Sequence, residues 1–144
     1  MEERRRQQVT ERAVRVVGVF ESPQGRDPFV LLQDSRGRSL PIFVGPAEAV
    51  AIHIALDRQT PSRPLTHDLM KLLIERLGGK LESVLVDDLY KNVFYAKLSL
   101  RQGDRTHEID CRSSDAIALG LRFGVPIYVG DHVLEEGQCE ISEE

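Results

Sequence analysis

Alternating apolar and polar side chains predict a strand from residue 13 to residue 20, which the Pro23-Gln24-Gly25 cluster ends. Two shorter apolar runs, at residues 29–33 and 40–44, lie on either side of a turn-like segment at residues 34–37. Runs of this length separated by turn residues are typical of neighbouring strands. The first third of the chain therefore predicts an antiparallel meander of three strands.

Helical spacing then replaces this alternation. A first helix is predicted from Pro46 to about Asp57, with Pro46 at the first helical position and Glu48 in the first turn, where a carboxylate complements the helix dipole. A second helix is expected to begin with Thr66 as its N-cap. Its apolar residues recur at helical spacing and are expected to pack on a sheet: Leu69, Met70, Leu73, Ile74 and Leu77.

The second half of the chain predicts more strands and one more helix. A third helix at residues 115–123 is expected to be capped by Ser113 or Ser114 and ended by Gly124. Four strands are predicted at residues 81–89, 93–100, 105–111 and 126–129. The sum is a mixed α/β (α+β) fold with a largely antiparallel sheet and three principal helices.

Length and charge indicate one folded domain with two polar ends. A chain of 144 residues has the usual size of one domain, here assigned to residues 13–134. Residues 1–12 contain three consecutive arginines but no apolar period, and are expected to form a flexible arm. Residues 135–144 carry five acids and no base, so the net charge of −4 is concentrated in an acidic tail. Charge alone neither requires nor excludes nucleic acid as a partner.

The sequence also carries signals about location. The first residues, MEERRRQQ, do not resemble a secretory signal, and the apolar run at residues 47–56 is far shorter than the roughly 20 residues that span a bilayer. Cys111 and Cys139 have no CxxC spacing and predict neither a disulfide framework nor a zinc site. We interpret both as thiols in a reducing cytoplasm, with Cys111 more easily explained as inert than as reactive.

Two polar clusters at element boundaries are candidates for chemistry. In the first, Arg63 could offer a guanidinium to phosphate, and His67 could move a proton near neutral pH. Plain helix capping by Thr66, with Asp68 in the first turn, explains the same residues and is favoured by the pattern alone. Asp87 and Asp88, elsewhere, could bind metal but more often mark a turn.

The second cluster, at residues 110–115, lies where a strand leads directly into a helix. Such junctions commonly bind anions, because free helix amides point at the ligand. Asp110 and Asp115 could share a divalent cation, Arg112 could hold phosphate, and Ser114 could donate a hydrogen bond. A helix cap with an ordinary ion pair remains the alternative.

Four blocks of sequence, taken together, resemble the bifunctional nuclease family, small domains to which DNase and RNase activity is attributed. The resemblance runs from about residue 13 to residue 137 and rests on LPIFVGPAEAVAI, RPLTHDLMKLLIERLGG, FYAKLSL and IDCRSSDAIALGLRFGVPIYV. In the family the last block usually begins Asp-Ala-Arg-Pro-Ser-Asp-Ala-Ile-Ala. This chain has Cys111 in place of Ala and Ser113 in place of Pro, and matches at Asp110, Arg112, Ser114, Asp115, Ala116 and Ile117.

The resemblance implies a compact α/β fold, an oligomer with a dimer as the first choice, and nuclease activity. It also draws attention to positions that match the polar pattern of the family: Glu48, Arg63, Thr66, His67, Asp68 and Tyr95.

The resulting hypothesis is a nuclease, a phosphodiesterase that cleaves DNA or RNA with little sequence preference. Its expected catalytic residues are His67, Asp68, Asp110 and Asp115. Its expected substrate-binding residues are Arg63, Arg112, Ser114 and Tyr95. A divalent metal such as Mg²⁺ or Mn²⁺ could be held by Asp110, Asp115 and Glu48, although no spacing requires one. The alternative is a non-catalytic binding or regulatory domain that holds an anionic ligand or a protein partner through the same polar corner.

Overall fold

Seven strands form one sheet, and most of them are antiparallel. The computed structural model describes residues 1–25 and 27–139. The strands are β1 (Glu11–Phe20), β2 (Phe29–Asp34), β3 (Ser39–Phe43), β4 (Gly79–Tyr90), β5 (Val93–Gln102), β6 (Arg105–Arg112) and β7 (Ile127–Gly130), in the spatial order β3-β2-β1-β7-β4-β5-β6. Among the strands that the structure describes, only β4 and β7 pair in parallel. The predicted mixed fold with a largely antiparallel sheet, in one compact domain, is confirmed.

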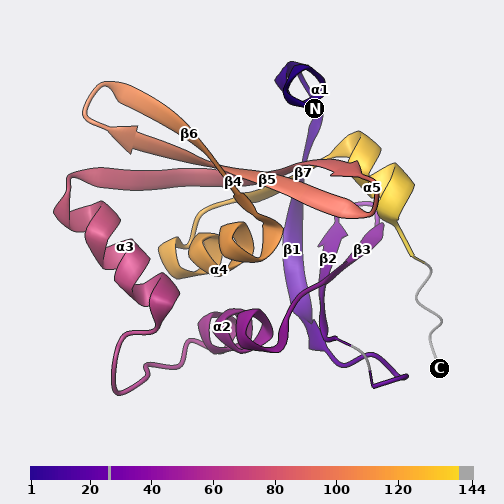
Figure 1. Ribbon diagram of the computed structural model, residues 1–144, viewed down its shortest axis with the longest axis horizontal. Coiled ribbons are helices and arrows are strands. Elements are labelled where there is room, and N and C mark those ends of the chain that lie inside the picture. Colours follow the sequence, from indigo (N-terminus) through magenta and orange to yellow (C-terminus); the bar gives the residue numbers. More distant parts are fainter. Residues whose placement is uncertain (26, 140–144) are drawn as a thin grey trace.

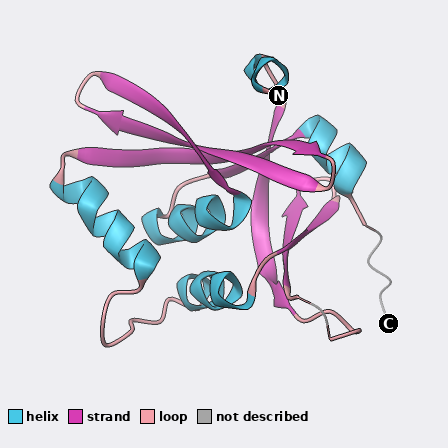
Figure 2. Cartoon of the chain, in the orientation of Figure 1, coloured by secondary structure: helices cyan, strands magenta, loops and turns pink. Residues whose placement is uncertain are grey.

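Three long helices cover one face of the sheet, and a short helix lies over the other. Among the described residues the helices are α1 (Glu2–Arg6), α2 (Pro46–Leu56), α3 (Thr66–Arg76), α4 (Ser113–Phe123) and α5 (Asp131–Gly137). Figure 1 shows α2, α3 and α4 below the sheet and α1 above it, and Figure 2 shows the same arrangement by element type. None of these helices is long and apolar enough to span a membrane.

The buried faces follow the alternation of the sequence. On β5, Ala96, Leu98 and Leu100 are buried, while the residues between them are half-buried. Leu98 lies opposite Val84 of β4, and Val84 lies close to Gly120 of α4. A side chain larger than glycine at position 120 would crowd that contact, so α4 is held close to the sheet.

The strand β7 joins the two halves of the molecule. It lies between β1 and β4 and pairs with both, antiparallel to β1 and parallel to β4. The crossover through α4 that precedes it makes the parallel pairing possible, since parallel strands cannot be joined by a tight turn. The N-terminal meander and the β4–β5–β6 hairpins therefore share one sheet, with α4 at its centre.

Both predicted helix caps differ from the structure by one or two residues. The N-cap of α3 is Leu65 rather than Thr66, and the Asp68 carboxylate accepts a hydrogen bond from the Leu65 amide at 2.9 Å. The N-cap of α4 is Arg112, so Ser113 lies inside the helix. In each case the helix begins earlier than the position of a capping hydroxyl predicts. In α3 the Asp68 carboxylate caps the first turn, and in α4 the helix follows directly from the end of β6.

Several apolar residues of α3 do not face the core as expected. Met70 and Ile74 pack against the buried cluster. Leu69, Leu73 and Leu77 are exposed by 50%, 52% and 73%. The helix crosses the end of the sheet with only part of its apolar stripe covered, which a periodicity analysis of one chain cannot reveal.

The two ends of the chain contain elements that the sequence pattern did not predict. Residues 2–6 form α1, within the arm expected at residues 1–12. Glu135 and Glu136 belong to α5, and Cys139 pairs with Ser39 beside β3. The remainder of the predicted acidic tail, from residue 140, lies outside the described residues.

Candidate functional site

The first turns of α3 and α4 meet through one hydrogen bond between side chains. His67 is the second residue of α3 and Asp115 the third residue of α4. The Nε2 atom of His67 lies 3.0 Å from Oδ1 of Asp115. His67 is 8% exposed, and its Nδ1 atom is buried without a hydrogen-bond partner among the described residues. This imidazole is therefore enclosed, with its one paired nitrogen directed at Asp115.

Arg112 extends this pair toward solvent. Its Nε atom lies 2.9 Å from Oδ2 of Asp115, and Nη2 lies 3.0 Å from Oδ1. Its Nη1 atom lies 3.2 Å from Oε1 of Glu48, in the first turn of α2. We call His67, Asp115, Arg112 and Glu48 the polar network. The Arg112 side chain is 64% exposed, so the guanidinium is the part of the network that a solute can reach most easily.

The two carboxylates of the network are held in their ionised form. The hydrogen bond from His67, followed by the contacts with Arg112, holds the pKa of Asp115 well below its usual range, although burial opposes this. The pKa of Glu48 is lowered by its own backbone amide and then by Arg112. The pKa of Arg112 is raised, first by its hydrogen bonds to Asp115. At neutral pH the network therefore contains two negative charges around one guanidinium.

Asp68 does not join this network. Its Oδ1 atom accepts a hydrogen bond from Nε of Arg122 at 2.8 Å, and its other oxygen caps Leu65. Burial raises the pKa of Asp68, but the Leu65 amide and Arg122 together outweigh it and hold the pKa below the usual value. Arg122 was not recognised from the sequence. Its spacing of seven residues from Asp115, two helical turns, is the signal that places both on the same side of α4.

Asp110, Arg112 and Asp115 line the same cavity, of about 510 Å³, between α3, α4, β5 and β6. Its other lining side chains are mainly apolar, such as Met70 and Ile109. The carboxylate of Asp110 pairs with Arg5 of α1, and its side chain is 72% exposed. Asp110 thus borders the cavity without bonding to the polar network.

In the described chain, the side chains of Ser114, Tyr95 and Arg63, the remaining predicted residues, do not bond to the polar network. Ser114 is buried in the first turn of α4 and lines a second cavity, of about 420 Å³, together with Glu48 and Arg112. Tyr95 lies opposite Arg112 in the pairing of β5 with β6. Arg63 lies in the loop before α3, and no hydrogen bond or ion pair links it to another residue that the structure describes.

The described residues do not form a ready metal site. Within residues 1–25 and 27–139, no three histidine, cysteine or carboxylate side chains converge to hold a metal ion. Glu48 and Asp115 are both directed at Arg112, whereas Asp110 is directed at Arg5. These three carboxylates therefore do not fit the divalent metal that the sequence allowed, and no chemical step is derived through one.

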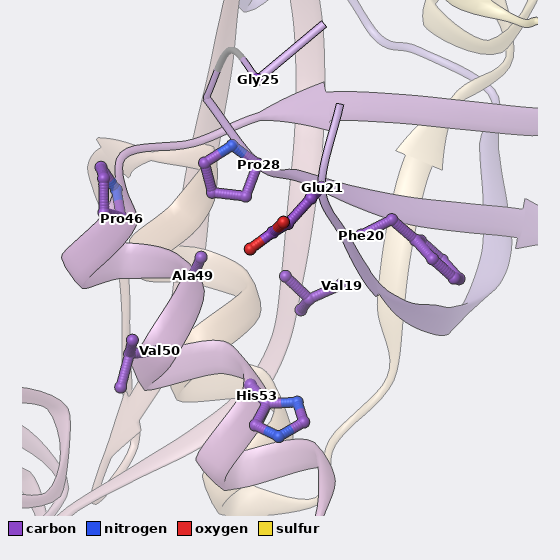
Figure 3. Close-up of a pocket in the computed structure, with 9 residues that line it drawn as sticks. All are labelled: Val19, Phe20, Glu21, Gly25, Pro28, Pro46, Ala49, Val50 and His53. Carbon is purple, nitrogen blue, oxygen red and sulfur yellow. The ribbon is translucent and has the colours of Figure 1, made fainter. Parts of the chain in front are cut away.

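A separate apolar hollow of about 500 Å³ lies between α2 and the end of β1. Figure 3 shows it lined by residues such as Val19, Pro28 and Ala49, with Glu21 and His53 as its titratable groups. His53 lies 3.1 Å from Asp57 of its own helix turn. None of the residues that line this hollow belongs to the polar network.

Cys111, next to Arg112, is predicted to be a poor nucleophile. Burial, followed by the nearby carboxylates of Asp115 and Asp110, raises the pKa of its thiol to about 12. Since the thiolate is the reactive form, iodoacetamide at pH 8 should modify the exposed Cys139 much faster than Cys111. Peptide mass spectrometry over a time course checks this, and equal labelling of both thiols in folded protein would contradict it.

Comparison with known proteins shows which family this sequence belongs to. Residues 30–142 match the family model described as "Bifunctional nuclease domain". The chain belongs to the bifunctional nuclease domain family. An uncharacterised protein of Mycobacterium tuberculosis is 44% identical over 133 residues, which cover 91% of this chain and 79% of that protein.

Two plant relatives carry a functional name. Bifunctional nuclease 2 of Arabidopsis thaliana is 29% identical over 105 residues, covering 71% of this chain and 32% of that protein. Bifunctional nuclease 2 of Oryza sativa subsp. japonica is 30% identical over 123 residues, covering 77% of this chain and 38% of that protein. The chain therefore spans about a third of the length of these plant relatives. The family resemblance seen in the sequence is confirmed.

Proposed function

We propose that this protein is a nuclease that hydrolyses phosphodiester bonds of DNA or RNA with little sequence preference. Membership in the bifunctional nuclease domain family supports the class of reaction. The plant relatives named bifunctional nuclease support it further, although they are much longer chains. The observation that carries the proposal in this chain is Arg112, an exposed guanidinium held in place at the border of two cavities.

Arg112 is the group proposed to bind the scissile phosphate. A guanidinium has five N–H donors, and its contacts with Asp115 and Glu48 occupy three of them. The remaining two N–H groups are available for phosphate oxygens. Because the two carboxylates fix the plane of the guanidinium, little side-chain entropy is lost on binding.

The neighbouring groups are given roles that match their surroundings. Asp115 and Glu48 orient Arg112, and the buried His67 orients Asp115 through its Nε2 atom. Asp110 is the exposed carboxylate on the same cavity and is proposed to accept a proton from the attacking water. Water then forms the new bond to phosphorus, and the departing oxygen takes up a proton from solvent. His67 therefore serves in this proposal as a positioning residue.

The test is an assay of purified protein on end-labelled single-stranded DNA, duplex DNA and RNA. Accumulation of cleaved products, at a rate that is proportional to protein concentration and that changes with substitutions in the polar network, supports a nuclease. Binding without cleavage, measured by fluorescence anisotropy on the same oligonucleotides, supports the alternative of a non-catalytic domain for an anionic ligand. That alternative is favoured by one observation: the two network carboxylates are already paired with Arg112.

A homodimer is also proposed, with the exposed side of α3 as its contact surface. Leu69, Leu72, Leu73 and Leu77 form an exposed apolar stripe there, and stripes of this kind commonly mark interaction surfaces. Light scattering should give a mass near twice the 16.2 kDa of the chain. Leu73→Glu should reduce it to the mass of one chain, while Arg36→Glu, on an exposed turn, should not. A mass near 16.2 kDa for the unmodified protein at all concentrations would contradict this.

The proposed location is the cytoplasm. The two unpaired thiols, Cys111 and Cys139, support it, since a reducing compartment keeps cysteines in that form.

A further inference from the structure

Two adjacent carboxylates of β4 are buried on the face of the sheet that α1 covers. Asp87 and Asp88 are 3% and 2% exposed. The pairing of β4 with β5 shifts register between Val86 and Asp88, which makes Asp87 the extra residue of a β-bulge. In a regular strand neighbouring side chains point to opposite faces, and the bulge allows both carboxylates to reach the same helix. The expectation that these residues mark a turn is wrong.

Two consecutive arginines of α1 bind these carboxylates side by side. Nε and Nη2 of Arg5 lie 2.9 and 3.1 Å from the two oxygens of Asp87. Nη2 of Arg4 lies 2.9 Å from Oδ1 of Asp88, and its Nε atom contacts the other oxygen. Both pairs are bidentate, the strongest arrangement for a guanidinium and a carboxylate. Figure 1 shows α1 above the sheet.

Within the described chain, few other cationic side chains pair with these carboxylates. Nζ of Lys97 is 3.9 Å from Asp87, and Nε2 of His132 is 3.4 Å from Asp88. Both distances are longer than those of the arginines. Arg4 is also the largest influence that lowers the pKa of Asp88. A buried carboxylate without a close partner is strongly unfavourable, so the two arginines are the main groups that make this burial tolerable.

The same contacts extend to residues near the candidate site. Arg5 also pairs with Asp110, and its guanidinium lies 5.2 Å from the ring centre of Tyr95. Asp110 is two residues before Arg112 on β6. The family match begins at residue 30, so α1 lies outside it, whereas the carboxylates that α1 binds lie inside it.

We propose that residues 1–6 form a removable strap, and that Asp87, Asp88 and Asp110 form an acidic socket that recognises a segment with two consecutive arginines. In this structure the chain's own Arg4 and Arg5 fill the socket. A segment of the same chemistry supplied from outside binds it when the strap's arginines are absent. Filling the socket pairs Asp110 with Arg5 while Asp110 lines the cavity beside Arg112, so the strap and the candidate site are coupled through β6.

The test uses the full-length protein with Arg4→Gln and Arg5→Gln together. Removing the charged partners of two buried carboxylates is strongly destabilising, so Tm should fall by about 10 °C or more. Arg6→Gln is the matched control, because it removes a charge of the same kind from the same helix. Arg6 is 79% exposed, and among the described residues its ion pair is with Glu2, at 3.9 Å. That control should leave Tm within about 2 °C of the original value.

A labelled peptide with the sequence of residues 1–8 should then bind the double variant and raise its Tm. The same peptide with lysine at positions 4 and 5 should bind about 10-fold more weakly or worse, since lysine cannot form a bidentate pair. Adding Asp87→Asn and Asp88→Asn to the double variant should abolish peptide binding and recover part of the lost Tm. Peptide that fails to bind at about 1 mM, the effective concentration of a short tether, would overturn the socket.

A measurement on the unmodified protein keeps the strap testable if the double variant does not fold. In ¹⁵N NMR spectra, the Nε–H signals of Arg4 and Arg5 should exchange slowly with water at neutral pH, while that of Arg6 should exchange too fast to observe. Equal, fast exchange of all three would show that the strap is not docked and would overturn the proposal.

Discussion

Replacing Arg112 with glutamine should lower the rate of nucleic-acid hydrolysis by about 10²-fold or more. The substitution keeps the aliphatic part of the side chain but removes the charge and the two free N–H donors proposed to face phosphate. Negative charge on the phosphate oxygens is stabilised in the transition state, so the loss should fall mainly on kcat. Steady-state cleavage of a labelled single-stranded oligonucleotide measures it, and circular dichroism verifies that the variant is folded.

Arg101→Gln is the matched control for this experiment. Arg101 lies on the neighbouring strand β5 and is 54% exposed, and within the described part of the chain it pairs with Glu82 alone, at 3.3 Å. The substitution Arg101→Gln removes one surface charge of the same kind, far from the polar network. A general loss of attraction for nucleic acid would therefore affect both variants alike. Equal activity of the original protein, Arg112→Gln and Arg101→Gln would contradict the proposed role and indicate a contaminating nuclease.

The sequence predicted most of the sheet because local pattern determines strands and turns. The strand ends at β2, β3 and β6 lie within one residue of the predicted positions. The position of β7 between β1 and β4 was not predicted, since pairing order depends on contacts between segments far apart in the chain. The helix caps were misplaced for a related reason: Asp68 caps Leu65 from within the helix, which a search for a leading hydroxyl overlooks.

For the candidate site, the sequence predicted which polar residues lie there but not which of them bond to each other. The strand-to-helix junction placed Arg112 and Asp115 together, and the resemblance drew attention to His67 and Glu48. Nothing in the sequence connects His67 to Asp115, 48 positions away. The bond between them exists because α3 and α4 pack against each other at their first turns. Which groups bond depends on this tertiary packing, so the role of a polar residue is less predictable than its presence.

Replacing Asp115 with asparagine should lower the free energy of unfolding by about 2–3 kcal/mol at pH 7, because His67 and Arg112 lose a charged partner in a largely buried position. The folded-state pKa of Asp115 lies below its unfolded value of about 4. A depressed pKa stabilises the fold above the unfolded value, and this contribution is lost as pH falls toward the folded value. The difference in free energy of unfolding between the original protein and Asp115→Asn should therefore become steadily smaller from about pH 5 to pH 2.

Urea unfolding followed by circular dichroism at pH 7, 5, 4 and 3, at one protein concentration, measures this gap. The other carboxylates with lowered pKa values, such as Asp34 and Asp88, are present in both proteins and largely cancel in the difference. Asp104→Asn, in the exposed turn between β5 and β6, is the control and should show a small gap that does not change with pH. A gap for Asp115→Asn that stays constant down to pH 3 would mean that Asp115 is not held in its ionised form by His67 and Arg112. The polar network would then lack the fixed carboxylate on which the orientation of Arg112 depends.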